Sequence, residues 1–195
     1  MTKKHIILIL LISSLFFSCS SNVGFRKYGS EKHDRIPVCK PRIHNVFPHD
    51  PNAFTQGLFY TDGFLYESTG LNGKSSLRKV DIKTGMVVQQ INLAADYFGE
   101  GITLSKNKII LLTWKNKQGF VYDKNTFQLI DEFSYPTEGW GITFDGQYLI
   151  MSDGTDALYY LNPDDYSLVK KVNVSEAGKA MYNLNELEYI NGKIY

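Results

Sequence analysis

Short turn sequences recur along this chain at intervals of about 39 to 46 residues, a regularity that restricts the possible folds strongly. These turns are Asp62-Gly63, Lys106-Asn107, Asp145-Gly146 and Asn191-Gly192. Three of the four are residue pairs that two-residue β-hairpins favour. A second turn lies about halfway between successive members, at 83–85, 124–125 and 162–165. From Phe54 onward, the residues between turns alternate with the period of two that is typical of strands.

Two hairpins in each repeat predict a four-stranded propeller blade, which must stack on its neighbours because it cannot bury both faces alone. We therefore predict an all-β fold, a β-propeller domain over 41–195. Its blades are expected at 54–93, 98–135 and 139–174, and the first strand or two of a fourth from Leu184. An irregular β-sandwich is the alternative, but sandwiches do not usually repeat a phrase such as Gly-x-Gly-Ile-Thr at this interval.

Three blades and part of a fourth do not close a ring, since propellers usually have about four to eight blades. The last residues pass through the turn at Asn191-Gly192 and stop in the returning strand at Tyr195. We therefore expect the sequence to be an incomplete copy of a longer protein, and we expect that protein to be a monomer.

The N-terminus predicts export. Lys3 and Lys4 precede a mainly apolar run over 5–17, which is shorter than the roughly 17–25 residues of a membrane-spanning helix, so we assign 1–18 as a signal peptide. Cys19 follows a sequence similar to a relaxed lipoprotein cleavage box, which predicts lipid on Cys19 and a polar tether over 19–40. The expected location is the cell envelope, with membrane attachment through this lipid. An ordinary secretory signal cleaved nearby is the alternative.

Charge and cysteine content exclude several function classes. The net charge of +1 comes from dispersed acids and bases, which argues against a nucleic-acid partner. Without Cys19, only Cys39 remains, and it is buried, paired outside this chain or free. No neighbouring base would activate it as a nucleophile.

A lone carboxylate interrupts an apolar strand at Glu100, between Gly99 and Gly101. Glycine permits close approach of other atoms, so we expect a ligand to come near this carboxylate. The plainer alternative is a carboxylate that faces the propeller channel and binds water or closes a hydrogen bond within a blade.

Six phrases in order resemble the plant-type glutaminyl-peptide cyclotransferases, also called glutamine cyclotransferases. They are Phe47-Pro48-His49-Asp50-Pro51 running into Ala53-Phe54-Thr55-Gln56-Gly57-Leu58, Tyr66-Glu67-Ser68-Thr69-Gly70, Phe98-Gly99-Glu100-Gly101, Gly139-Trp140-Gly141, Ser152-Asp153-Gly154-Thr155 and Leu184-Asn185-Glu186-Leu187-Glu188. The resemblance implies a five-bladed propeller that converts the N-terminal glutamine of peptides to pyroglutamate and releases ammonia. It implies no cofactor and no catalytic metal.

The resemblance also implies roles for individual residues. Glu100 matches the family's proposed catalytic glutamate, which acts as general acid and base. Matches to substrate-binding positions are Phe54, Gln56, Phe98, Trp114, Trp140 and Asn185. The aromatic members would line the site and the two amides would hydrogen-bond the substrate, although ordinary packing is the alternative for each aromatic residue. Relatives also use an aromatic residue and a lysine from later blades, which 1–195 does not contain.

Other acids have structural interpretations. Glu67 is expected to be structural or at the pocket edge, and Asp153 and Asp156 to belong to a turn rather than a calcium site. Glu186 and Glu188 would orient Asn185 or bind an ion in the channel. Three alternative functions stay open. They are a non-catalytic propeller that binds peptide termini or sugars, an inactive truncated remnant, and a propeller hydrolase with a channel-bound metal.

Overall fold

The computed structural model describes residues 40–195. The predicted signal peptide, the lipidated Cys19 and almost all of the tether, including Cys39, lie outside the described residues. Within 40–195 no helix is long and apolar enough to cross a membrane.

Twelve strands form three consecutive four-stranded antiparallel sheets, each connected strand to neighbouring strand. The first blade contains β1 (Thr55–Thr61), β2 (Phe64–Thr69), β3 (Ser76–Asp81) and β4 (Val87–Asn92). The second contains β5 (Gly99–Ser105), β6 (Lys108–Thr113), β7 (Gln118–Asp123) and β8 (Leu129–Ser134). The third contains β9 (Ile142–Phe144), β10 (Leu149–Ser152), β11 (Ala157–Leu161) and β12 (Leu168–Asn173).

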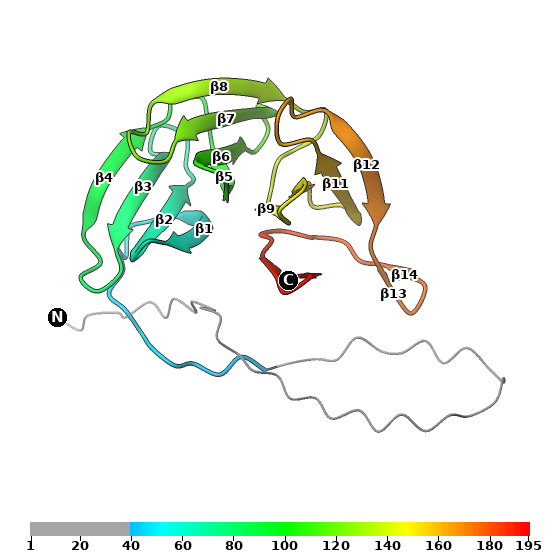
Figure 1. Cartoon of the computed structure of the whole chain (residues 1–195), viewed down its shortest axis with the longest axis horizontal. Coiled ribbons are helices and arrows are strands. Elements are labelled where there is room, and N and C mark those ends of the chain that lie inside the picture. Colours follow the sequence, from blue (N-terminus) through cyan, green and yellow to red (C-terminus); the bar gives the residue numbers. More distant parts are fainter. Residues whose placement is uncertain (1–39) are drawn as a thin grey trace.

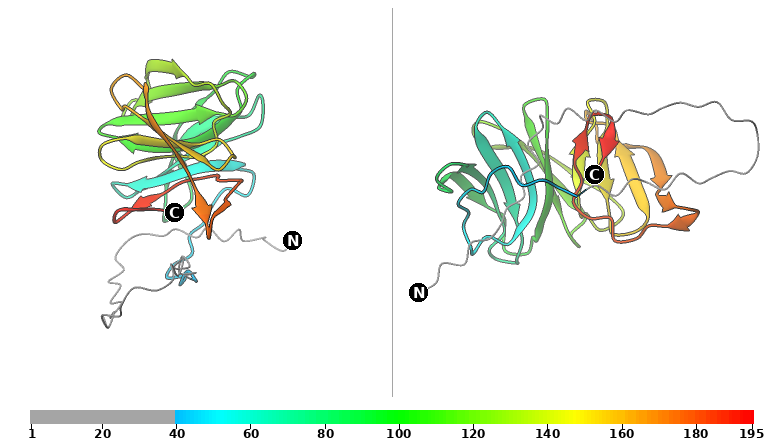
Figure 2. Two further views of the ribbon diagram at one scale, coloured as in Figure 1. Left: turned by 90° about the vertical axis from the view of Figure 1, so that its right-hand side faces the viewer. Right: turned by 90° about the horizontal axis from the view of Figure 1, so that it is seen from below.

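The three sheets stand around a common centre in an open arc, with β1, β5 and β9 innermost and β4, β8 and β12 outermost (Figure 1). In the right-hand view of Figure 2, the strands of the blades run roughly from top to bottom. They therefore run roughly along the direction from which Figure 1 is viewed. Every predicted turn lies between two paired strands, and the three predicted blades are confirmed to within a few residues. The fold is therefore the blade series of a propeller, and the sandwich alternative is wrong.

The chain after β12 differs from the prediction. An unexpected hairpin pairs β13 (Ser175–Glu176) with β14 (Lys179–Ala180), and the next blade begins with β15 (Tyr189–Ile190) and β16 (Lys193–Ile194). The residues over 184–188, where the fourth blade was expected to begin, are irregular. Its backbone binds to a side chain of the third blade instead, because Ser152 Oγ donates a hydrogen bond of 2.7 Å to the backbone oxygen of Asn185.

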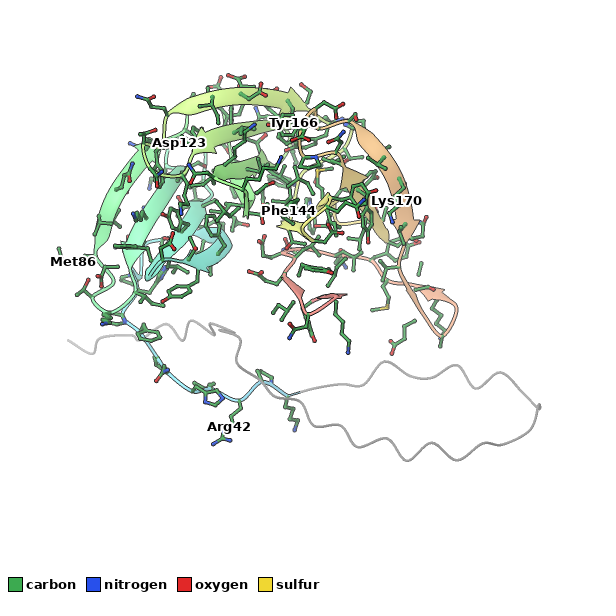
Figure 3. The ribbon with its side chains drawn as sticks, viewed as in Figure 1. Arg42, Met86, Asp123, Phe144, Tyr166 and Lys170 are labelled. Carbon is green, nitrogen blue, oxygen red and sulfur yellow. The ribbon has the colours of Figure 1, made fainter. Side chains whose placement is uncertain are left out.

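Apolar side chains fill the space between neighbouring sheets, whereas Met86 and Lys170 lie at the outer edge (Figure 3). Successive side chains of β6 point to opposite faces of the sheet, so this strand packs against both neighbouring blades. Ile109 and Leu111 pack towards the first blade, and Ile110 and Leu112 pack towards the third. All four are fully buried, so the strand is a continuous apolar run rather than an alternating one.

Candidate active site

All seven residues predicted for the site lie at the same end of the blades. Each occurs at or just before the start of the inner strand of a blade, or just after the end of the strand that follows it. Because these two strands are antiparallel, both positions lie at the same end of the sheet. The residues before or in an inner strand are Phe54 and Gln56 for β1, Phe98 and Glu100 for β5, Trp140 for β9, and Asn185 for β15, while Trp114 follows β6. The topology thus gathers the predicted residues at one end of the inner strands, which we call the channel mouth.

Three aromatic residues from two blades form a continuous row. The Phe54 and Phe98 rings meet edge to face with centroids 6.2 Å apart, and Phe98 meets Trp114 at 5.5 Å. Gly70 lies directly behind Phe98, where a Cβ atom would come within 3.0 Å of the ring. Gln56 lies beside the same glycine. Part of the predicted aromatic wall is therefore assembled by side-chain contact.

The two tryptophans are joined by a residue that the sequence did not indicate. Glu138 Oε2 accepts a hydrogen bond of 2.6 Å from Trp114 Nε1 and one of 3.0 Å from Trp140 Nε1. Trp114 and Glu138 are 24 positions apart, so only the fold brings them together. The only sign of this role in the sequence is that Glu138 lies two residues before Trp140, a pattern that is too common to identify a site.

Glu100 is buried, with 7% of its surface exposed. Burial, together with the smaller effect of the nearby charge of Glu138, raises the pKa of its carboxyl to about 8. Within 40–195 no cation or hydrogen-bond donor offsets these two effects. The carboxyl can therefore both accept and donate a proton near neutral pH.

The glycines beside Glu100 serve the packing of blades. A Cβ atom at Gly101 would lie 2.6 Å from the backbone oxygen of Trp140, and one at Gly99 would lie 2.7 Å from that of Thr69. The expectation that a ligand uses this close approach is wrong, because the protein's own backbone occupies both positions. Ser68 Oγ also donates a hydrogen bond to the backbone oxygen of Glu100, which fixes the first blade to the second.

Asn185 joins the site less directly. Its side chain is exposed, and its backbone oxygen holds it to Ser152. No hydrogen bond within 40–195 connects its amide to another predicted residue. The structure therefore places Asn185 at the same end of the blades as Glu100, with no hydrogen bond between the two within 40–195.

The other acids divide into structural and unpaired groups. Glu67 is 1% exposed and binds His49 Nε2 at 3.0 Å and the Thr55 hydroxyl, which agrees with a structural role. Asp153 accepts hydrogen bonds from Thr155 and Tyr159, as expected for a turn.

Glu186 has two buried carboxylate oxygens that lack a hydrogen-bond partner within 40–195. Its pKa is raised well above the usual value by burial and by the charges of Glu188 and Glu100. Burial also raises the pKa of Glu188. No cluster of three or more His, Cys, Asp or Glu side chains in the described part of the chain has the arrangement of a metal site.

A hollow of about 420 Å³ adjoins the aromatic row. It is lined by Asn72, Asp96, Phe98, Trp114, Lys115 and Asn116. Lys115 Nζ lies 4.0 Å from the centre of the Trp114 ring, and Asn72 Nδ2 donates a hydrogen bond to the backbone oxygen of Asp96. The hollow shares two aromatic walls with the site but does not include Glu100.

The fold and the site together define a propeller protein with a buried carboxyl of raised pKa and a row of aromatic side chains at one end of its inner strands. The family model described as glutamine cyclotransferase matches residues 12–195. The chain belongs to the glutamine cyclotransferase family.

Individual relatives agree with this assignment. The chain is 44% identical over 151 residues to the glutaminyl-peptide cyclotransferase of Arabidopsis thaliana, a match that covers 76% of this chain and 47% of the relative. The crystal structure of Myxococcus xanthus glutaminyl cyclase superposes with a TM-score of 0.71 at 34% identity, over 76% of this chain and 63% of that one. The chain thus spans about half the length of the curated relative.

A more distant likeness shows the fold alone. The Neurospora crassa Pan2 WD40 domain matches with a TM-score of 0.56 at 12% identity, over 70% of this chain and 40% of that domain.

Proposed function

We propose that this protein is a glutaminyl-peptide cyclotransferase, which converts the N-terminal glutamine of peptides or proteins to pyroglutamate and releases ammonia. The observation that carries the proposal is the buried Glu100 carboxyl, whose pKa of about 8 suits proton transfer near neutral pH. Family membership supplies the reaction class.

In the proposed reaction, the substrate's α-amine attacks the carbonyl carbon of its own side-chain amide. A C–N bond forms in the new ring, and the bond to the amide nitrogen breaks. Glu100 takes a proton from the amine and returns it to the leaving nitrogen, which departs as ammonia. A free α-amine has a pKa of about 7.7–8.0, which is close to the pKa of about 8 of the Glu100 carboxyl. Proton transfer from the amine to this carboxyl therefore has a free-energy change near zero.

The aromatic residues suit the second requirement, which is to hold a flexible side chain bent. Phe54, Phe98 and Trp114 form a row beside the channel mouth, and Trp140 is joined to Trp114 through Glu138. In the proposal these rings enclose the aliphatic part of glutamine. Gln56 and Asn185 hydrogen-bond its polar groups, as their match to family positions implies. The hollow beside Trp114 accommodates the residues that follow glutamine in the peptide.

The proposed setting is the cell envelope, with the protein attached through lipid on Cys19 as a monomer. The support for this setting is the N-terminal sequence. Replacement of Cys19 by serine should release the protein from membranes in a sedimentation assay. If the serine variant stays membrane-bound while its signal is cleaved, the lipid attachment is wrong.

The test of activity uses a peptide that begins with glutamine. Mass spectrometry should detect a product lighter by one ammonia, and Glu100→Gln should lower kcat by about 10²–10⁴-fold while peptide binding persists. Glu176→Gln, an exposed carboxylate in the β13–β14 hairpin, is the matched control. A full rate in Glu100→Gln would exclude Glu100 as the acid and base. Saturable peptide binding without ammonia release would instead identify a binding propeller.

A further inference from the structure

One carboxylate oxygen links the two tryptophans of the candidate site. Trp114 follows β6 of the second blade, and Trp140 precedes β9 of the third. Both indole N–H groups donate to Glu138 Oε2, at 2.6 and 3.0 Å. Glu138 itself lies in the segment that connects the two blades, so a single residue sets the spacing of two walls from different sheets.

We propose that Glu138 is a positioning residue of this site, whose carboxylate orients the indole rings of Trp114 and Trp140 for substrate binding. The inference rests on the proposed function, because it is the proposed substrate that these rings would hold. Hydrogen bonds to an ionised acceptor are roughly twice as strong as neutral ones, so a carboxylate fixes the rings better than an amide would.

The segment around Glu138 is held rigidly to the second blade. The Tyr135 hydroxyl donates a hydrogen bond of 2.5 Å to the backbone oxygen of Thr113 and accepts one of 2.9 Å from its N–H. The N–H of Gly139 donates to the backbone oxygen of Trp114 at 3.1 Å. Because hydrogen bonds on both sides of Glu138 tie it to the strand end that carries Trp114, its carboxylate has a fixed position relative to that ring.

The ring of Trp140 also packs against the backbone at Gly154. Gly154, at the turn after β10, has a φ of +79°, and a Cβ atom there would lie 2.6 Å from the ring carbon Cζ2. The indole of Trp140 therefore packs against backbone and donates its single ring N–H to Glu138. These two constraints define one orientation of the indole.

Glu138 has a second effect, which is electrostatic. Its charge acts on Glu100 and raises the pKa of that carboxyl. The other titratable groups coupled to Glu100 are Glu186, from the segment after β14, and Tyr135. The neighbouring cations are Lys115, above the Trp114 ring, and Lys117, which binds the backbone oxygen of Pro136. Removal of the charge at position 138 should therefore lower the pKa of Glu100.

The chain offers a direct test because Trp114 and Trp140 are its only tryptophans. In a ¹H–¹⁵N NMR spectrum, the indole signals of Trp114 and Trp140 both report on Glu138. In Glu138→Gln both signals should shift upfield, since a neutral acceptor replaces a charged one. In Glu138→Ala both should move towards the position of a water-exposed indole. Glu176→Gln, the exposed control, should leave both signals unchanged.

Kinetics supply the second readout. Glu138→Ala should raise KM for a glutaminyl peptide by about tenfold with a smaller change in kcat, because the rings lose their orientation and Glu100 stays in place. Glu138→Gln keeps an acceptor oxygen, so it should largely restore KM. It should also move the acidic limb of the kcat/KM profile to lower pH, which loss of structure alone would not do.

Two results would overturn the inference. If neither indole signal, or only one, responds to Glu138→Gln, the shared acceptor does not exist in solution. If both signals respond while peptide affinity is unchanged in Glu138→Ala, the rings are joined but do not position substrate. Peptide affinity is measured by quenching of tryptophan fluorescence, without turnover. A protein that binds peptide through Glu138 but releases no ammonia would therefore refute the proposed function and leave the positioning role supported.

Discussion

The backbone N–H of Gly101 donates a hydrogen bond of 2.7 Å to the backbone oxygen of Trp140. This bond joins the residue after the proposed proton carrier to a residue of the proposed binding wall, and it crosses from the second blade to the third. The distance between Glu100 and Trp140 is therefore fixed by backbone atoms, which side-chain motion does not alter.

Gly101→Ala should disrupt this junction. Its Cβ atom would lie 2.6 Å from the Trp140 oxygen and 2.8 Å from the Gly141 Cα, and backbone atoms cannot move aside cheaply. We expect a loss of about 1–3 kcal/mol in the free energy of unfolding, measured by urea titration. The control is Gly63→Asn, at a turn with φ +84° and open space, which should cost well under 1 kcal/mol. Equal effects of the two substitutions would contradict the packing role of Gly101.

Glu100→Gln should stabilise the protein at alkaline pH. Folding raises the pKa of Glu100 from 4.5 to about 8, so the folded state binds its proton more tightly than the unfolded state. Stability is therefore lost as pH rises from about 4.5 to 8. Each unit of pKa difference corresponds to about 1.4 kcal/mol, and we expect the variant to be more stable by a few kcal/mol at pH 8.5 and about equal to wild type at roughly pH 4.

Urea titrations at both pH values check this prediction, with Glu176→Gln as the control. A variant that is less stable than wild type at pH 8.5 would show that the Glu100 carboxylate is stabilised in the folded protein, contrary to its buried setting.

His49→Gln should destabilise the protein mainly at acidic pH. The hydrogen bond from His49 Nε2 to Glu67 is the largest cause that raises the pKa of His49 above 6.5, assisted by the charges of Glu67 and Asp50 and opposed by burial and Arg78. The pair stabilises the fold fully below pH 6.5, and this contribution is lost as pH rises through the raised pKa.

The expected loss for His49→Gln is about 3 kcal/mol at pH 6, because the buried Glu67 would lose its charge-assisted hydrogen bond with His49. At pH 9 the loss should be clearly smaller. His44→Gln, at an exposed position, is the control and should have no effect at either pH. A loss that is independent of pH would mean that His49 acts through packing and not through its charge.

Gly70→Ala should weaken substrate binding through Phe98. The new methyl group would overlap the Phe98 ring and push it out of the row with Phe54 and Trp114. We expect KM for a glutaminyl peptide to rise by about tenfold, since a loss of about 1.4 kcal/mol of binding free energy has this effect. Steady-state kinetics measure it.

Gly119→Ala is a matched control, because its methyl group would overlap the Phe133 ring in the core between blades. It should lower stability without raising KM. If both variants raise KM equally, Phe98 has no special part in binding.

The sequence predicted the blades because their signals are local. Turn pairs such as Asp62-Gly63 need positive φ, and Asp62 and Gly63 have φ values of 52° and 84°. The alternation between turns then fixes which side chains face each interface. The β13–β14 hairpin escaped prediction because its turn, at Ala177 and Gly178, interrupts the repeat and follows no alternating run.

The candidate site was predictable only in part. Glu100 stands out as an acid in an apolar strand, and the resemblance to a family indicated the aromatic residues. Glu138 could not be found in this way, because its importance depends on where Trp114 lies in space. The role of Gly101 was misjudged for the same reason, since the atom that approaches it belongs to another blade.

Each blade contributes the start of its inner strand to the channel mouth, and the second blade adds Trp114 after β6. A change confined to the start of one inner strand therefore alters one part of the proposed site and leaves the starts of the other inner strands in place. Libraries for new peptide preferences can be built one repeat at a time, and the hairpin turns at the opposite end, such as Asp62-Gly63, are free to carry labels or surface attachments.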